Sequence, residues 1–496
     1  MNSSDGTQYA LTKALVEEKT IFIDKFLQWT YFTDYANYNH HFLSDRQLGQ
    51  SIFGIPFYFI GKILLPLTND PYNGLHPGIN PDSKIQVLTI LSSAVIGSGS
   101  VVIYYLFIVL KLKASKYIAL LSSLIFGLGT LHWKYSSVYY RQPLSIFFLL
   151  GTLYLLINNH KNSINRYLSF LTGLFIGLVI FIDSSLIVTL PILFLYYLNT
   201  QMRFTNFRQR IIQGLIGIML PVSINSIYTY FAFGQLFTNP YFFEVNTKFH
   251  FMKNLYTAFQ TPLLPSLLVN LFSNNYPIPP STIAPFIWEN ENLRNALSAY
   301  WATVHPYRGI FSQTPALFLA FIGLIIISIK RLKLFILLIT TSLSIIIIQS
   351  KYSMFYSANN YDTRFFLPAV PFLILGLTSW WNFILLMKNK NIKTAIILLT
   401  IFLSLMSIYN GWYSNLTNYA PNVTGEHRFS FEQLRQPVFS SENIKENLWL
   451  LFLNTFPNIY NIHLLFIFYF PLFFVIYLFI FQRKFMIRVW KKLKTK

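Results

Sequence analysis

The chain has 496 residues, of which 54% are hydrophobic and only 11% charged, whereas soluble domains carry about 25% charged residues. This composition excludes a soluble globular protein and indicates several membrane spans, because a charged side chain at bilayer depth costs roughly 3 kcal/mol. The formal net charge of +21 falls largely between apolar runs, which is typical of membrane topology and excludes nucleic acid as a partner. No cysteine is present, so a disulfide, a thiolate metal site and a thiol nucleophile are excluded too.

The first fifty residues are polar and carry charges of both signs. We expect one amphipathic helix at about residues 9–18, with Leu11, Ala14 and Leu15 on its apolar side. Aromatic residues follow this helix, and Trp and Tyr favour the level of the lipid headgroups. The segment is therefore predicted to lie along the membrane interface.

The apolar run at residues 51–67 is interrupted by Pro56, Gly61 and Lys62. If this run crossed the membrane, residues 1–50 would be cytoplasmic. If it lies in the interface, or dips in and returns, they are external. We favour the second topology. It places the N-terminus outside the cell, although no span in the sequence would carry it across the membrane. We therefore expect that a first span is missing.

From residue 86 onward, apolar runs end alternately in basic and in polar-aromatic connections. The basic connections are residues 111–116, 159–166, 201–210, 330–333, 388–393 and 483–496. Placing all of them in the cytoplasm predicts about eleven spans, each near the length of about 20 residues that a bilayer requires. These spans cover approximately residues 86–110, 117–133, 143–158, 167–182, 185–199, 211–232, 314–329, 334–349, 365–387, 394–409 and 463–482.

The predicted fold class is all-α, a polytopic transmembrane helical bundle with juxtamembrane helices and external loops. We divide the chain into a first external loop with interfacial helices (residues 1–85), a transmembrane domain (residues 86–482) and a basic cytoplasmic tail (residues 483–496). Two long external loops are expected within the transmembrane domain, at residues 233–313 and 410–462. Clustered prolines predict that the first of these is irregular.

Several basic side chains fall on the external side, against the trend of the other lysines and arginines. Each one alone is explained by snorkelling or by a local ion pair. Together they favour a phosphate or diphosphate held at headgroup depth, because a guanidinium group offers a planar fork of donors that matches phosphate oxygens. These residues are Arg46, Lys134, Arg141, Arg308 and Arg364.

Acidic residues on the same side are candidates for proton transfer or for support of the basic groups. Asp5 is also explained as the N-cap of the expected helix, since Gln8 follows three residues later as in a capping box, and the two roles do not exclude each other. Asp362 with Arg364 is also explained as an ordinary exposed salt bridge, and Asp183 is either a solvated turn residue or a group that points into a cavity. The other acidic residues on this side are Asp24, Asp34, Asp45 and a few glutamates of the external loops.

Metal and nucleophile motifs are weak. His40, His41 and His132 are not spaced like the ligands of a zinc site, so no metal is expected. The residue types of Ser/His/Asp catalysis occur in the sequence, but a nucleophile-elbow motif does not.

Five stretches occur in an order that resembles a known family. They are SSDGTQYALTKALVEE (residues 3–18), SDRQLGQSIFGIPFYFIGKIL (44–64), LIFGLGTLHWKYSSVYYRQPLSIFFLLGTLYLL (124–156), PYRGIFSQTPALFLAFIGL (306–324) and YDTRFFLPAVPFLIL (361–375). Together they resemble bacterial and archaeal membrane glycosyltransferases of the GT-C superfamily, in particular the protein mannosyltransferase and aminoarabinose transferase group.

The resemblance implies a lipid-linked sugar phosphate as donor, an acid early in the first external loop that acts on the acceptor, and basic residues that meet the donor phosphate. Carried onto this sequence, the acid is Asp5 and the basic residue at the end of that loop is Arg46. We assign the other external arginines of the recurring motifs to the phosphate as well, namely Arg141, Arg308 and Arg364. The supporting candidates are Asp45, Lys134, Asp183 and Asp362.

The sequence departs from the family in two places. The span that precedes the acid in the family is absent before Asp5, and Gln47-Leu48-Gly49 replaces the small-residue and proline pattern that commonly follows the basic residue.

The predicted function is that of a multi-pass plasma-membrane glycosyltransferase. It moves a sugar from a polyprenyl-phosphate donor to a hydroxyl or amine on the external face, with inversion and without a metal or other cofactor. One alternative is a transporter or flippase for an anionic lipid-linked substrate, although no inverted repeat is visible. The other is a non-catalytic protein of the cell envelope.

Overall fold

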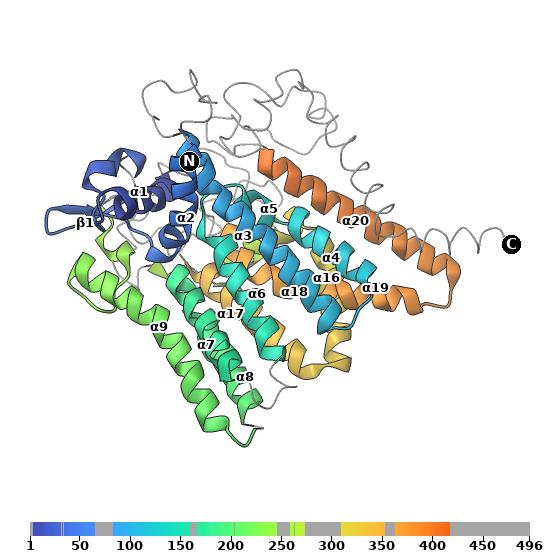
Figure 1. The fold of residues 1–496 in the computed structure, drawn as a ribbon. Coiled ribbons are helices and arrows are strands. Elements are labelled where there is room, and N and C mark those ends of the chain that lie inside the picture. Colours follow the sequence, from blue (N-terminus) through green and yellow to red (C-terminus); the bar gives the residue numbers. More distant parts are fainter. Residues whose placement is uncertain are drawn as a thin grey trace, which may run out of the picture.

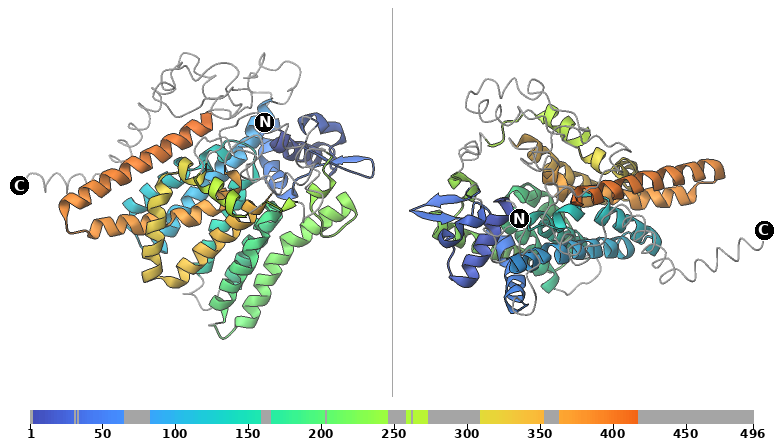
Figure 2. Two further views of the ribbon diagram at one scale, coloured as in Figure 1. Left: turned by 180° about the vertical axis from the view of Figure 1, so that it is seen from behind. Right: turned by 90° about the horizontal axis from the view of Figure 1, so that it is seen from above.

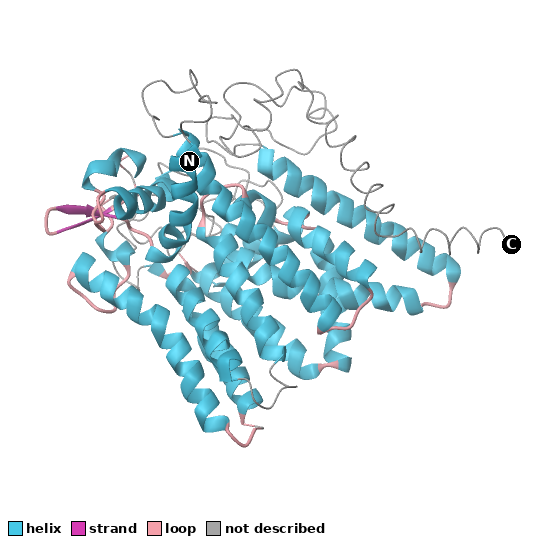
Figure 3. Cartoon of the chain, viewed as in Figure 1, coloured by secondary structure: helices cyan, strands magenta, loops and turns pink. Residues whose placement is uncertain are grey.

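The structure is a computed structural model that describes residues 3–30, 32, 34–64, 83–158, 166–202, 204–245, 258–261, 263–272, 309–352 and 363–416. Helices make up almost all of the regular structure, and within these residues the one sheet has two short strands (Figure 3). The predicted all-α, polytopic class is therefore confirmed.

The N-terminal segment contains α1, η1, β1, β2 and α2, and the remaining elements form the bundle (Figure 1). Their bounds are α1 Ser3–Glu17, η1 Asp24–Thr30, β1 Ala36–Tyr38, β2 His41–Leu43, α2 Leu48–Leu64, α3 Ser83–Leu110, α4 Lys116–Leu128, α5 Leu131–Ser136, α6 Arg141–Asn158, α7 Arg166–Ile182, η3 Ser184–Thr189, α8 Leu190–Gln201, α9 Phe207–Phe233, η4 Pro240–Phe243, α11 Leu263–Phe272, α15 Ile310–Gln313, α16 Ala316–Lys330, α17 Leu332–Lys351, η7 Arg364–Ala369, α18 Val370–Ile374, α19 Gly376–Leu386 and α20 Lys390–Leu416.

Five helical stretches of the described chain are long and apolar enough to cross a membrane. They are Ile85–Leu110, Phe207–Phe233, Leu332–Lys351, Arg364–Leu386 and Lys390–Trp412. Shorter apolar helices cover Leu48–Leu64, Lys116–Leu128, Arg141–Ile157, Tyr167–Ile182 and Ala316–Lys330. The count of about eleven spans stays a prediction, and residues 463–482 and the tail lie outside the described part.

Basic connections lie on the same side of the bundle, as the alternation in the sequence predicted. The turns α3–α4, α8–α9, α16–α17 and α19–α20 follow the lower and right-hand border in Figure 1, away from the N-terminal segment. Arg331, between α16 and α17, donates hydrogen bonds to the carbonyl oxygens of Lys111 (2.9 Å) and Leu112 (3.3 Å) after α3. Two of the predicted cytoplasmic connections are thus in direct contact.

Helix α1 begins six residues before the expected amphipathic helix and is buried along residues 5–14. The helix is thus covered by other parts of the protein, and the position of this segment at the membrane interface stays a prediction. Burial is possible because its hydroxyl groups find partners: Thr7 bonds the hydroxyl of Ser44, and Thr12 bonds that of Tyr139. Asp5 lies inside the first turn of α1, so the interpretation of Asp5 as the N-cap is wrong.

The predicted interfacial segment contains a β-hairpin that the sequence did not suggest. Strands β1 and β2 are antiparallel, and Asn39 and His40 between them have φ angles of 49° and 65°. Two left-handed residues make the tight turn that matches the twist of a two-stranded hairpin. The Asp24 carboxylate fixes the second strand by accepting a hydrogen bond from the backbone nitrogen of Phe42 at 2.6 Å.

Helix α2 runs antiparallel to the first turns of α3. Gln50 contacts Ser93, and Gly61, eleven residues further on, lies against Ile85. Helix α2 therefore pairs with only the N-terminal part of the 28-residue α3. Whether residues 51–67 cross the membrane stays a prediction.

Helices α7 and α9 lie side by side in both views (Figures 1 and 2). Their backbones approach at glycines: a Cβ atom on Gly173 would lie 1.9 Å from the carbonyl oxygen of Gly214. Small residues permit this close packing between membrane helices. The two helices therefore run parallel, and α9 continues beyond the end of α7.

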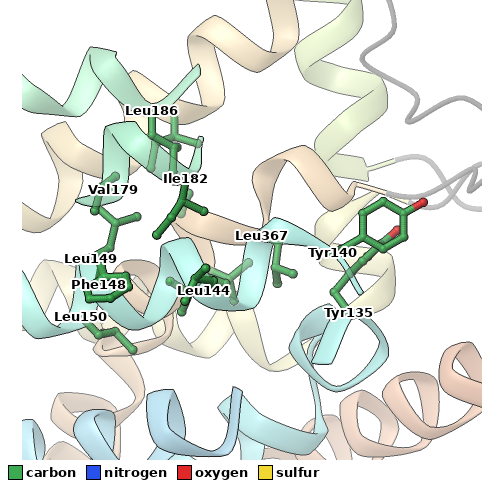
Figure 4. Packing of buried hydrophobic residues seen from close by; sticks show 14 of the residues in the cluster. Tyr135, Tyr140, Leu144, Phe148, Leu149, Leu150, Val179, Ile182, Leu186 and Leu367 are labelled. Atoms are coloured by element: carbon green, nitrogen blue, oxygen red, sulfur yellow. The ribbon is translucent and has the colours of Figure 1, made fainter. Parts of the chain in front are cut away.

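A dense core lies between the start of α6 and the end of α7. Leu144 and Leu149 of α6, Ile182 of α7 and Leu367 of η7 are fully or almost fully buried (Figure 4). Close-packed interiors leave little room for side chains to shift. This core therefore fixes the ends of three elements that carry charged residues.

The loop at residues 233–313 is less irregular than its prolines suggested. Helix α9 ends at Gly234, whose φ of 69° is the usual left-handed helix stop. The short elements η4, α11 and α15 follow within the described residues. Most of the rest of the loop, and all of the second long loop from residue 417 onward, lies outside the described part.

Candidate functional site

Arg46 is the centre of a buried group of charges at one end of the bundle. Its guanidinium bonds the carboxylate of Asp45, and it also lies 3.8 Å from the carboxylate of Asp34. All three side chains are at most 8% exposed. A buried arginine of this kind is stable only because the carboxylates compensate its charge.

Glu244 joins this group from the segment after α9. It pairs through a backbone bridge with Ala36 of β1, and its carboxyl group donates a hydrogen bond to Asp45. Burial and the neighbouring charge of Asp45 raise the pKa of Glu244 to about 11. Glu244 is therefore protonated at neutral pH. Burial raises the pKa of Asp45 as well, whereas the positive charge of Arg46 lowers it.

Tyr241 lies between two arginines. The centre of its ring is 4.7 Å from the Arg46 guanidinium carbon and 5.9 Å from that of Arg141. Arg141 also donates a hydrogen bond to the Tyr241 hydroxyl at 3.0 Å. The negative face of a phenol ring attracts cations. Tyr241 therefore attracts both arginines and separates them from each other.

Arg141 is the first residue of α6 and is paired with Asp183, which follows α7. The nitrogen Nε of Arg141 lies 3.0 Å from an oxygen of Asp183. The other oxygen of Asp183 accepts hydrogen bonds from the backbone and hydroxyl of Ser185 and thereby caps η3. Asp183 is therefore a buried residue that caps η3 and pairs with Arg141, and it is not a solvated turn residue.

Arg364 approaches the same region from η7. Its guanidinium lies 5.1 Å from the centre of the Tyr140 ring and 4.8 Å from that of Phe365. Burial raises the pKa of the nearby Tyr352 phenol, and Tyr241 raises it further, whereas Arg46, Arg141 and Arg364 each lower it. The fields of all three arginines thus meet at Tyr352, just after α17.

We call Arg46, Arg141 and Arg364, with Tyr241 and Tyr352, the arginine cluster. Three guanidinium charges in it face three carboxylates, those of Asp34, Asp45 and Asp183, while Glu244 is neutral. The cluster is therefore not a bare positive patch. A phosphate group that enters it must compete with Asp45 for Arg46 and with Asp183 for Arg141.

Two other predicted site residues are also buried. Lys134 of α5 has its ammonium group 5.5 Å from the centre of the Tyr135 ring. Asp5 is 1% exposed in the first turn of α1, where Thr7 bonds Ser44 of the segment leading to Arg46. Arg308 and Asp362 lie outside the described residues.

Three carboxyl groups of the site are close enough to hold a cation. Oxygen atoms of Asp34, Asp45 and Glu244 lie within 4.8 Å of one another. Arg46 already supplies a positive charge to two of these groups, and the third keeps its proton. The donor set is thus satisfied by a guanidinium group and a shared proton, although its spacing also suits a divalent ion.

His132, one of the histidines considered as a metal ligand, is a packing residue. Its ring stacks on Phe126, and its Nε2 hydrogen-bonds the carbonyl oxygen of Gly97 at 2.9 Å.

Three important members of the site were missed by sequence reasoning. Tyr241, Glu244 and Tyr352 lie in connections whose course depends on how α9 and α17 end. Of these three, only Glu244 could have been noticed in the sequence, because it is an acidic residue in a predicted external loop. The aromatic residues could not be distinguished from the many other Tyr and Phe residues of the chain.

No model of a known protein family matches this sequence, and neither does a curated protein. Among solved structures, the chain is similar to the archaeal oligosaccharyltransferase AglB from Archaeoglobus fulgidus in complex with an inhibitory peptide and a dolichol-phosphate. The TM-score is 0.44 at 12% identity, over 87% of this chain and 53% of that chain. The chain thus spans about half the length of that enzyme, and a likeness of this degree establishes no shared activity.

Proposed function

We propose that this membrane protein is a glycosyltransferase that uses a polyprenyl-phosphate sugar as donor. The observation that carries the proposal is that Arg46 and Arg141 share the ring of Tyr241, while Arg364 lies over the ring of Tyr140, the neighbour of Arg141 in the sequence. A buried anion site at one end of a membrane bundle suits a phosphate group whose lipid chain remains in the bilayer. The resemblance of the five sequence motifs to GT-C enzymes supports the same activity.

The arginine cluster serves the leaving group in this proposal. As the bond between the sugar C1 and the phosphate oxygen breaks, negative charge accumulates on the phosphate. Arginines held in place before the reaction stabilise that charge without reorganisation. Arg141 and Arg46 are held in this way by Asp183, Asp45 and the Tyr241 ring.

Asp5 is proposed as the base. It takes the proton of the acceptor hydroxyl or amine, the acceptor atom bonds to C1 from the opposite face, and the phosphate leaves with the electron pair of the broken bond. The product then has the inverted configuration at C1. Asp5 is at the N-terminal end of a helix, which stabilises its charged form, and α1 contacts the segment that leads to Arg46 through Thr7 and Ser44.

The proposal also covers the side of the membrane on which the reaction takes place and the need for a metal. The arginine cluster lies away from the basic connections, so the positive-inside trend assigns it to the external face of the plasma membrane. Arg308 and Asp362 are proposed as further contributors because they belong to the same sequence motifs. No metal is required, since arginine charges replace it at the leaving group.

The test is transfer by purified protein in phosphatidylcholine vesicles. Radiolabelled decaprenyl phosphohexoses are supplied with a membrane extract as the source of acceptors, and product formation is measured beside uptake of label into the vesicles. We expect product with and without a metal chelator, and an Asp5→Asn variant that folds but forms at least a hundredfold less. Glu18→Gln, an exposed acid immediately after the same helix, is the matched control.

Uptake without product would instead identify a transporter or flippase. An Asp5→Asn variant with full activity would exclude Asp5 as the base, and loss of activity on chelation would exclude a metal-independent reaction.

A further inference from the structure

Three buried glutamines have amide carbonyl oxygens that no described group bonds. Gln47, Gln50 and Gln142 are 3%, 1% and 2% exposed, and the Oε1 atom of each lacks a hydrogen-bond donor. A buried acceptor without a partner costs about 1–3 kcal/mol relative to a satisfied one. Native structures rarely keep such atoms unless a ligand or water bonds them.

All three glutamines adjoin the arginine cluster. Gln47 follows Arg46 and Gln142 follows Arg141 in the sequence, while Gln50 lies in the first turn of α2, three residues after Gln47. Other buried acceptors without a donor occur elsewhere in the described residues, and these three are distinguished by their position close to the arginines along the chain.

Contacts of the amide nitrogens locate two of these groups more closely. Gln47 donates to the hydroxyl of Ser184 at 3.0 Å, and Ser184 adjoins Asp183, the partner of Arg141. Gln50 donates to the hydroxyl of Ser93 on α3 at 3.4 Å. Each amide is thus held by its nitrogen, and its oxygen remains available.

We infer that these amides form a subsite for the neutral hydroxyl groups of a hexose. This inference rests on the proposed function, because the hexose is the one carried by the phosphate in the arginine cluster. Sugar hydroxyls are donors that satisfy amide oxygens, and neutral amides bind them without the cost of burying another charge. Arg46 and Arg141 are already paired with Asp45 and Asp183, so a neutral ring suits the subsite better than a charged one.

The test compares two probes on the protein in phosphatidylcholine nanodiscs, decaprenyl phosphate alone and decaprenyl phosphate carrying mannose, glucose or galactose. We expect the wild-type protein to bind at least one hexose form more tightly than the bare phosphate. In Gln50→Met and Gln47→Met this preference falls at least fivefold, while the affinity for decaprenyl phosphate stays within twofold. Methionine matches glutamine in length and flexibility and removes the amide.

The stability of the same variants distinguishes a binding role from a structural one. Since each substitution removes an unsatisfied acceptor, we expect the melting temperature of Gln50→Met to stay the same or rise. The control is Gln201→Met, at the opposite end of the bundle, where the amide oxygen accepts a hydrogen bond from Arg210 and the nitrogen bonds Thr200. That variant should melt at a lower temperature and keep its preference for the hexose form.

An unchanged hexose preference in Gln47→Met and Gln50→Met would overturn the subsite, as would a wild-type protein that binds bare decaprenyl phosphate as tightly as every hexose form. In both cases the proposed function would survive, because phosphate binding is intact. If the protein bound none of the probes, both the proposed function and the subsite would be wrong.

Discussion

Glu244 shows how a single residue in the site responds to its surroundings. Its pKa rises from an ordinary value of 4.5 to about 11 because it is buried beside the charged Asp45. Between these two pH values the folded protein keeps a proton that the unfolded chain releases. The free energy of unfolding therefore falls as pH rises, by up to about 1.4 kcal/mol per pH unit from this group.

This behaviour predicts the effect of Glu244→Gln. Glutamine has a neutral amide that donates to Asp45 as the protonated carboxyl group does, so we expect the fold to be kept. The melting temperature of the wild-type protein should fall more steeply between pH 5 and pH 9 than that of the variant, and the variant should be the more stable one at pH 9. Thermal unfolding at a series of pH values measures this difference.

Glu18→Gln is the control for this series, because Glu18 is exposed and pairs only with Lys25 among the described contacts. Parallel curves for the wild-type protein and Glu244→Gln would mean that Glu244 does not hold a proton in the folded state.

Some site residues were predictable because their charge contradicts a general trend. Arg46, Arg141 and Arg364 stood out as external cations. In the structure the first two share the Tyr241 ring, and the third lies over Tyr140, the neighbour of Arg141. Their partners were not predictable, since the pairing of Arg141 with Asp183 depends on the packing of α6 against α7. The backbone bridge between Glu244 and Ala36 was not predictable either, because the two residues are far apart along the chain.

At the scale of helices, the packing of α7 on α9 depends on glycine. A Cβ atom at position 173 would overlap the carbonyl oxygen of Gly214, which belongs to the backbone and cannot turn away. We expect Gly173→Ala to force the helices apart and to destabilise the protein by about 1–3 kcal/mol. Thermal unfolding in detergent measures the loss.

Gly99→Ala is the matched control for this substitution. Its Cβ atom would lie 3.0 Å from the edge of the Phe147 ring, a side chain that can move by a few tenths of an ångström. Equal losses in the two variants would show that backbone contact between α7 and α9 is not the cause.

The elements of the bundle were largely predictable, and those of the first fifty residues were not. Apolar length and basic connections define helices such as α3 and α9, because a membrane span needs about 20 apolar residues. Burial of α1 depends instead on hydroxyl groups that meet partners from other segments, such as Tyr139. A periodic pattern predicts the helix but not that tertiary contacts cover its polar side.

At the scale of the whole molecule, the charged residues divide into two groups. Basic connections lie along one side of the bundle, where Arg331 bonds the end of α3. The arginine cluster lies at the other ends of the helices and is held by carboxylates and aromatic rings. Our central claim is that this second group binds the phosphate of a lipid-linked sugar.

Arg364 is the best residue for testing this claim. Arg46 and Arg141 each hold a buried carboxylate, so removing either of them would also cost folding energy. Arg364 lies over the rings of Tyr140 and Phe365. Arg331→Gln, at the opposite end of the bundle, removes the same charge from a place that the claim does not involve.

The decisive measurement is the affinity of the protein in phosphatidylcholine nanodiscs for decaprenyl phosphate. A hydrogen bond to a charged group contributes about 1.5–3 kcal/mol, so Arg364→Gln should weaken binding by at least about tenfold, whereas Arg331→Gln should leave it unchanged. Equal affinity in the wild-type protein and Arg364→Gln, or equal losses in the two variants, would contradict the assignment of the phosphate to the arginine cluster.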